Sequence, residues 1–251
     1  MTPLLLPLPL FRLISRVIWR LPGTPARKMA EFSHVESGSG LDMLAATEAA
    51  TDPLLRRKYF RHALDELKHA RMFRERARIL ADSHGRAHAV LEDTGFIGDH
   101  GIRSDRSLVE QLGETEFLAF VWLHELAGAA QFEVYAELLR QDPDSTRMFE
   151  EIARDERFHI AYSRAELDRL AKAGAPVRRV VWTTRGRDLW QSWGRFAASF
   201  GDRMAAIWLT LLYFGLVAPF AMIARSRERL PGGLLPAEAI DPPGAYARRP
   251  G

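Results

Sequence analysis

The sequence predicts an all-α protein: a bundle of four long helices with a long crossover between the second and third, followed by a C-terminal transmembrane helix. Two observations predict the bundle. Four segments repeat apolar residues in steps of three and four, the spacing of one helix face, and a glycine-rich stretch divides these segments into two pairs. A third observation, a run of 21 uncharged residues near the C-terminus, predicts the membrane helix.

The four helices are expected at residues 26–50, 53–82, 108–140 and 145–173. A short turn joins the two helices of each pair. In the first turn, Asp52 can cap the following helix and Pro53 can take its first position. Residues 83–107 contain four glycines and are expected to form the crossover between the pairs.

Each predicted helix carries one glutamate within its apolar stripe. These residues are Glu36, Glu66, Glu125 and Glu156. A carboxylate buried in a core is costly unless it is paired or bound to a metal. Four such carboxylates facing one interior therefore favour a metal site.

Two copies of the motif D-E-x-x-H support the same prediction. They are Asp65-Glu66-Leu67-Lys68-His69 and Asp155-Glu156-Arg157-Phe158-His159. A glutamate and a histidine three positions apart lie on one helix face, one turn apart. The preceding stripe glutamate lies 30 positions before Glu66 and 31 positions before Glu156, so the whole pattern occurs twice. This repeat predicts a centre for two metal ions, with Glu36, Glu66, His69, Glu125, Glu156 and His159 as ligands.

On these residues the chain resembles the ferritin-like diiron-carboxylate superfamily over residues 29–173, within a predicted bundle domain of residues 26–174. The resemblance implies that Glu66 and Glu156 bridge the two metals, that Glu36 and Glu125 are terminal carboxylates, and that His69 and His159 each cap one metal. The D-E-x-x-H form is also similar to the bacterial multicomponent monooxygenases. That likeness implies that Asp65 and Asp155 hydrogen-bond the metal-bound histidines, with a solvated helix face as the alternative.

Two iron ions are the expected cofactor, with manganese as the alternative, because both metals suit carboxylate-rich sets with a few histidines. The chain has no cysteine, so it lacks the thiolate-bound iron domain of rubrerythrins and any electron relay of that kind. Reaction with O2 would then need an external electron donor, either a reductase or a quinol.

Small residues follow the stripe glutamates of the first and third helices. They are Gly38, Ser39, Gly40 and Gly128. Glycine in a helix interior costs about 1 kcal/mol relative to alanine, so these positions need a reason. A pocket for O2 or substrate is one reason, and close packing of helices is the other.

The segments that flank the bundle indicate a membrane. Residues 1–25 form an amphipathic arm, which is expected to lie in a membrane interface or, alternatively, against the bundle. Residues 175–203 combine Trp and Arg, as interfacial segments do. Residues 204–224 are expected to span the bilayer, with a buried core helix as the alternative, and residues 225–251 to form a flexible tail.

The expected function is that of a membrane-anchored diiron oxidase or oxygenase, which acts with O2 on an apolar substrate. The alternatives are a membrane-tethered iron-binding or peroxide-handling protein without an organic substrate, and a membrane scaffold with a vestigial site. The net charge of +3 is modest and predicts no nucleic-acid partner. The bilayer is the expected partner, a homodimer is left open, and the expected location is a bacterial-type inner membrane with the bundle on its cytoplasmic side.

Overall fold

The computed structural model describes residues 8–82, 95–97 and 105–227. Every regular element in this part of the chain is a helix, which confirms the all-α prediction. The chain divides into two compact units, Met1–Gly194 and Arg195–Gly251. The first unit contains the bundle and the candidate metal ligands.

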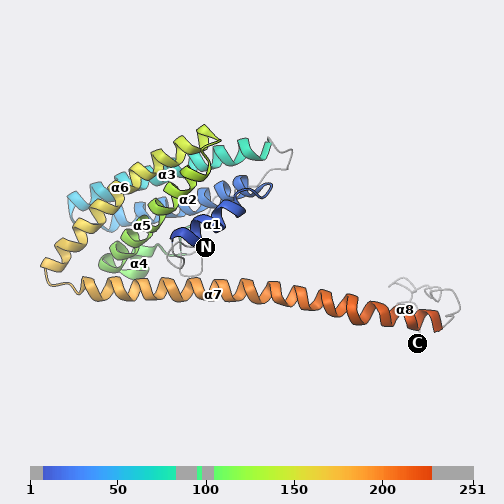
Figure 1. The fold of residues 1–251 in the computed structure, drawn as a ribbon. Helices are drawn as coiled ribbons and strands as arrows, with labels where there is room; N and C mark the ends of the chain where they lie inside the picture. The colour runs from blue at the N-terminus through green and yellow to red at the C-terminus, as the bar shows by residue number, and fades with distance from the viewer. Residues whose placement is uncertain (1–7, 83–94, 98–104, 228–251) are drawn as a thin grey trace, which may run out of the picture. The chain divides into compact units, whose positions relative to one another are not determined.

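Four long helices form the bundle (Figure 1). They are α2 (Thr24–Ala49), α3 (Pro53–Asp82), α5 (Glu114–Leu138) and α6 (Pro143–Lys172). Helix α2 packs mainly on α3, and α5 packs mainly on α6. Asp52 accepts a hydrogen bond from Leu54 N at 2.8 Å, and Asp142 accepts one from Ser145 N at 3.3 Å. These aspartates cap α3 and α6 and so define both turns.

The third helix predicted from the sequence begins as a separate short helix. Helix α4 (Leu108–Leu112) ends at Gly113, and α5 begins at Glu114. Gly113 has a φ of 76°, a left-handed value that favours glycine. The prediction of one continuous helix over residues 108–140 is therefore wrong at its first turns.

Apolar side chains fill the bundle in two clusters, with a polar layer between them. Aromatic rings dominate the first cluster, which includes Phe32, Phe73, Phe132, Tyr135 and Phe149. The second cluster includes Met43, Tyr59, Phe117, Leu118 and Tyr162. Helix α3 shows the order of these layers. Ala63 belongs to the second cluster, Glu66 to the polar layer and Phe73 to the first cluster. The polar layer thus lies in the middle of the helix, where apolar side chains shield it from both ends.

Residues 95–97 of the crossover lie against α2. Asp42 on α2 accepts hydrogen bonds from Ile97 N at 2.9 Å and from Leu108 N at 2.6 Å. One buried carboxylate therefore ties the crossover and the start of α4 to the first helix pair. Most of the predicted crossover, including His84, His88 and His100, lies outside the described residues.

The N-terminal arm contains α1 (Leu8–Ile18), which packs on the bundle. The rings of Phe11 and Trp19 lie 5.9 and 4.7 Å from the ring of Tyr135. These contacts favour the bundle-packed alternative for this side of the arm. On its other side Leu13 and Val17 are each 60% exposed, so an interfacial role stays a prediction.

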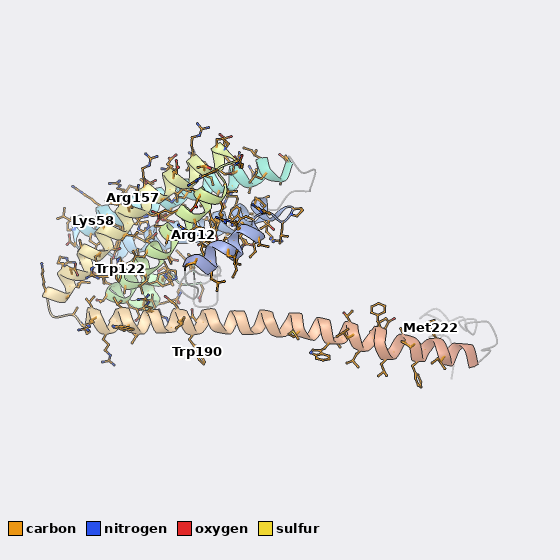
Figure 2. All side chains as sticks on the ribbon, viewed as in Figure 1. Arg12, Lys58, Trp122, Arg157, Trp190 and Met222 are labelled. Carbon is orange, nitrogen blue, oxygen red and sulfur yellow. The ribbon has the colours of Figure 1, made fainter. Side chains whose placement is uncertain are left out.

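Helix α7 (Val177–Leu212) begins in the first unit, where Val177 and Val180 pack against the second apolar cluster. Arg187 donates a hydrogen bond to Glu116 on α5. Figure 2 shows Trp190 projecting from the helix, and this side chain is 76% exposed. Contact of this segment with a membrane interface remains a prediction.

The predicted transmembrane helix over residues 204–224 is wrong. Among the described residues, no helix combines the length and the apolar character needed to cross a membrane. The uncharged run is divided among the end of α7, a π-helical turn η1 (Tyr213–Val217) and the start of α8 (Ala218–Arg227). Helix α7 is long, but charged residues interrupt most of it. The predicted inner-membrane location rested largely on this helix. The predicted tail lies outside the described residues from residue 228 onward.

Candidate metal centre

The four stripe glutamates meet in the polar layer, one from each long helix. Glu36 lies on α2, Glu66 on α3, Glu125 on α5 and Glu156 on α6. All but Glu125 are buried, and the side chain of Glu125 is 13% exposed. Each glutamate lies within the stripe of apolar residues that recur every three or four positions in its helix. The packing of these stripes brings the four carboxylates together, as the sequence predicts.

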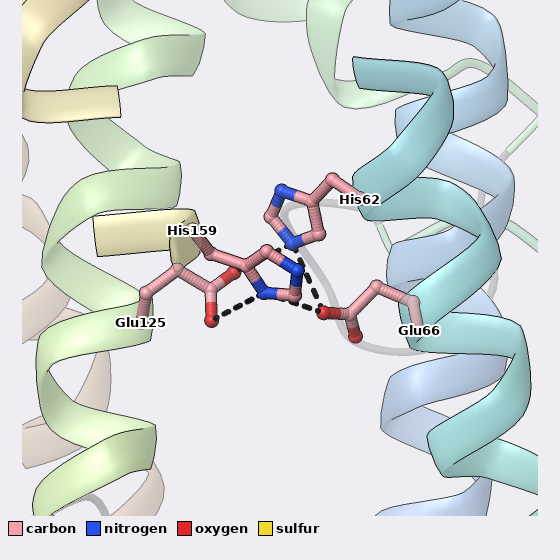
Figure 3. Close-up of side chains that lie close together, drawn as sticks. All are labelled: His62, Glu66, Glu125 and His159. Atoms are coloured by element: carbon pink, nitrogen blue, oxygen red, sulfur yellow. Dashed lines mark hydrogen bonds and ion pairs between the residues drawn. The ribbon is translucent and has the colours of Figure 1, made fainter. Parts of the chain in front are cut away.

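Two overlapping groups of side chains could each hold a metal ion. The first consists of His62, Glu66, Glu125 and His159 (Figure 3). The second consists of Glu36, Glu66, His69 and Glu156. Within each group, one ligand atom per residue lies within 4.8 Å of the others. All six ligands predicted from the sequence belong to these groups, and Glu66 belongs to both.

His69 presents one ring nitrogen to the centre and the other to a supporting carboxylate. Its Nδ1 lies 3.6 Å from Glu156 Oε1 and 4.0 Å from Glu36 Oε2. This nitrogen is buried and has no hydrogen-bond partner among the described residues. Its Nε2 lies 3.1 Å from Asp155 Oδ2. If Nε2–H donates to Asp155, the Nδ1 lone pair faces the carboxylates and is available to a metal.

His159 has the same arrangement. Its Nε2 lies 3.3 Å from Asp65 Oδ2, and its Nδ1 lies 3.2 Å from Glu156 Oε2 and 3.4 Å from Glu66 Oε1. The supports are exchanged between the motifs, because Asp65 holds the histidine of the second motif and Asp155 that of the first. Each aspartate therefore links α3 to α6 at the level of the centre.

His62 is a candidate ligand that sequence reasoning missed. Its Nε2 lies 3.0 Å from Glu66 Oε1 and 3.1 Å from Glu125 Oε1. Its ring stacks on that of His159, with centroids 3.5 Å apart. The available signal was its position four residues before Glu66, one turn earlier on the same helix face.

The carboxyl groups form two hydrogen-bonded pairs, Glu36 with Glu66 and Glu156 with Glu125. Burial, reinforced by nearby carboxylates, raises the pKa of Glu36 and Glu156 well above their usual value. Burial also raises the pKa of Glu66, to about 8. For Glu125, burial is outweighed by hydrogen bonds from Glu156 and His62, which lower its pKa. These shifts make Glu36 the donor to Glu66 and Glu156 the donor to Glu125 within the two pairs.

This donor set fits a pair of divalent metal ions. Four carboxylates carry the charge that two divalent ions neutralise, and the three imidazoles supply neutral nitrogen. The buried Nδ1 of His69, without a hydrogen-bond partner in the described part of the chain, is the kind of atom that a metal would satisfy. Oxygen-rich sets with a few imidazoles suit iron and manganese, and no cysteine is present to favour softer metals.

Of the small residues predicted to border a pocket, the two glycines on α2 have close neighbours, whereas Gly128 on α5 does not. A Cβ on Gly38 would lie 2.7 Å from Ile97 Cγ1, and a Cβ on Gly40 would lie 2.9 Å from Leu67 Cδ2. These contacts match the close-packing alternative for both glycines. Ser39 hydrogen-bonds to Glu66, and a Cβ on Gly128 would meet only Phe132, at 3.9 Å. A pocket for O2 or substrate beside these residues stays a prediction.

A groove of about 690 Å³ lies elsewhere on the first unit, between α1, α5 and α6. Its lining includes Arg12 and Arg157, both labelled in Figure 2, together with Glu133 and Phe149. None of the candidate metal ligands lines this groove.

Comparison of the chain with protein-family models, curated proteins and solved structures finds no match. The candidate metal centre therefore stands on its own geometry.

Proposed function

We propose that this chain is a ferritin-like protein with two iron ions, which uses O2 to oxidise an apolar substrate. The observation that carries the proposal is the sealed polar layer. Four carboxylates and three imidazoles converge between two apolar clusters, a costly arrangement unless cations are bound there. The doubled D-E-x-x-H motif and the exchanged aspartates support a centre for two ions rather than one.

The iron pair would supply the electrons that reduce O2. The chain would hold and shield that pair. Asp65 and Asp155 keep the Nε2 hydrogens of the two motif histidines, which leaves both Nδ1 lone pairs directed at the centre. Lys68 lies 2.8 Å from Asp155 and keeps that carboxylate ionised, since this contact helps to lower its pKa. The aromatic rings on either side exclude water and lower the local dielectric constant.

Electrons would come from outside the chain. The sequence contains no cysteine, and therefore no thiolate-bound iron centre that could relay them. A reductase or a reduced quinol is the proposed donor, and manganese could replace iron where the cell supplies it.

Iron or peroxide handling without an organic substrate is the second candidate. The packing at Gly38 and Gly40 favours it, because Ile97 and Leu67 already occupy the space beside these residues. An oxidase needs room for its substrate next to the metals, whereas an iron-handling protein does not.

O2 consumption by the purified full-length chain separates the two candidates. The protein is loaded with ferrous iron, its iron content is measured, and O2 uptake is followed with a chemical reductant and membrane lipids present. The oxidase predicts uptake that continues for many equivalents of O2 per bound iron and is lost in Glu66→Ala. Uptake only in proportion to the iron added would support iron handling instead. A chain that binds no iron would overturn both candidates.

A further inference from the structure

The two candidate metal positions have unequal ligand sets. One position is formed by His62, Glu66, Glu125 and His159, and we call it the two-imidazole position. The other is formed by Glu36, Glu66, His69 and Glu156, and we call it the one-imidazole position. This inference rests on the proposed two-metal centre. The difference between the two ligand sets comes from one residue, His62, which lies outside the repeated motif.

The position of His62 is that of a ligand. Its Nε2 and the Nδ1 of His159 approach the same oxygen, Glu66 Oε1, at 3.0 and 3.4 Å. The two rings are stacked and nearly parallel, with 17° between their planes, and both nitrogens lie beside the same carboxylate oxygen. Both side chains are fully buried. An ordinary ion pair between His62 and Glu66 needs only these two side chains. Here the imidazole of His159 also stacks on His62, and its Nδ1 faces the same carboxylate.

The second nitrogen of His62 has a different kind of support. Carboxylates hold the outer nitrogens of His69 and His159, whereas Nδ1 of His62 lies 2.7 Å from the hydroxyl of Tyr162. For the Nε2 lone pair to reach a metal, Nδ1 must carry the hydrogen and donate it to the Tyr162 oxygen. Tyr162 is buried, so its hydroxyl and the His62 ring meet away from solvent.

The repeat does not supply this arrangement twice. Ile152 occupies the position four residues before Glu156 that corresponds to His62, and Met72 occupies the position six residues after Glu66 that corresponds to Tyr162. Within the part of the chain that the structure describes, the third imidazole and its phenol support therefore lie at one metal position alone.

We propose that the metal pair is chemically unequal, and that His62, oriented by Tyr162, makes the two-imidazole position the selective one for nitrogen-preferring ions such as Fe²⁺ and Co²⁺. The one-imidazole position has the more oxygen-rich set and discriminates less against Mn²⁺. The chain can then hold a mixed pair, with the nitrogen-preferring ion beside His62. Tyr162 is a positioning residue in this arrangement, because it acts through His62.

Calorimetric titration of the chelator-treated full-length chain with Co²⁺, which is stable in air, tests this proposal. Two binding steps of different affinity are expected. Tyr162→Phe should weaken the tighter step by about tenfold, because removal of an outer support typically has an effect of this size. His62→Gln should weaken that step more than Tyr162→Phe does, because it removes the ligand itself. In a parallel titration with Mn²⁺, both substitutions should have a smaller effect, so the preference for Co²⁺ over Mn²⁺ should fall.

Matched controls are available on the same bundle. His124→Gln removes a histidine on α5 whose Nδ1 hydrogen-bonds to Phe120 O of the same helix. Tyr135→Phe removes a buried hydroxyl from the other apolar cluster. Both should bind Co²⁺ and Mn²⁺ as wild type does. Two equal Co²⁺ sites that His62→Gln leaves unchanged would overturn the inequality while leaving the two-metal centre intact. Failure of the wild-type chain to bind two ions would overturn the proposed function and this inference together.

Discussion

Asp65 of the first D-E-x-x-H motif supports His159 of the second, with Oδ2 3.3 Å from the imidazole Nε2. The reciprocal contact, Asp155 with His69, has a distance of 3.1 Å. Each motif therefore supplies the support for the candidate ligand of the other. This exchange couples the packing of α3 on α6 to the orientation of the ligands.

Substitution of one aspartate should therefore affect the histidine of the opposite motif. We expect Asp65→Asn to weaken metal binding by about 10- to 100-fold, because the imidazole loses its anionic support. In a double-mutant cycle, Asp65→Asn should add little to His159→Gln but should combine additively with His69→Gln. Co²⁺ affinities of the single and double variants measure this. Stronger coupling of Asp65 to His69 than to His159 would contradict the exchanged arrangement.

The stripe glutamates should be essential for metal binding, whereas nearby glutamates off the stripe should not. We expect Glu66→Ala to abolish binding of both ions, because Glu66 belongs to both groups of candidate ligands. Glu156→Ala should abolish binding at the one-imidazole position and weaken it at the other, because its carboxylate faces both motif histidines. Glu48→Ala and Glu133→Ala are the controls, because both side chains are exposed. Metal analysis of the four purified variants is the measurement, and equal iron content in all of them would refute the assignment.

The candidate ligands that could be predicted from the sequence are those that local geometry and repetition define. A glutamate in an apolar stripe and a histidine one turn later mark the same helix face whatever the neighbouring helices do. His62 lacked this support because its counterpart in the second half is Ile152. The exchange of Asp65 and Asp155 was beyond prediction for another reason: it depends on the relative rotation of α3 and α6, which a single helix does not encode.

The C-terminal prediction failed on a different physical point. An uncharged run of 21 residues meets the length requirement for a membrane span only if one apolar helix contains it. In the described part of the chain, no helix combines the required length with the required apolar character. Helix α7 is charged over most of its length, and the rest of the run belongs to η1 and α8. Composition alone does not reveal where one element ends and the next begins.

Two glycines should respond in opposite directions to substitution by alanine. At Gly40 a Cβ would lie 2.9 Å from Leu67, so Gly40→Ala should force α2 and α3 apart and lower the melting temperature. At Gly128 the nearest atom would be 3.9 Å away, so Gly128→Ala should stabilise α5 by about 1 kcal/mol through helix propensity. Thermal unfolding of both variants, followed by circular dichroism, is the test. A stabilising Gly40→Ala would show that the two helices do not need glycine to pack closely.

The pH dependence of stability should change sign when metal binds. Burial raises the pKa of Glu36 and Glu156, and that of Glu66 to about 8, against a usual value of 4.5. At pH values between the usual pKa of 4.5 and the raised pKa of each group, the folded chain without metal holds more protons than the unfolded chain. Its free energy of unfolding should therefore fall as pH rises. The slope is about 1.4 kcal/mol per pH unit for each carboxyl that is protonated only in the folded state.

Bound divalent ions replace these protons, so binding should release about three protons per chain near neutral pH and should strengthen as pH rises. Denaturant unfolding at pH 5, 6.5 and 8, with and without Mn²⁺, measures both slopes. In the double variant Glu36→Gln with Glu156→Gln, the slope without metal should be smaller, because two of the three titrating carboxyls are gone. A chain without metal that becomes more stable from pH 5 to 8 would show that these carboxyls are ionised in the fold, and that something other than a bound cation neutralises them.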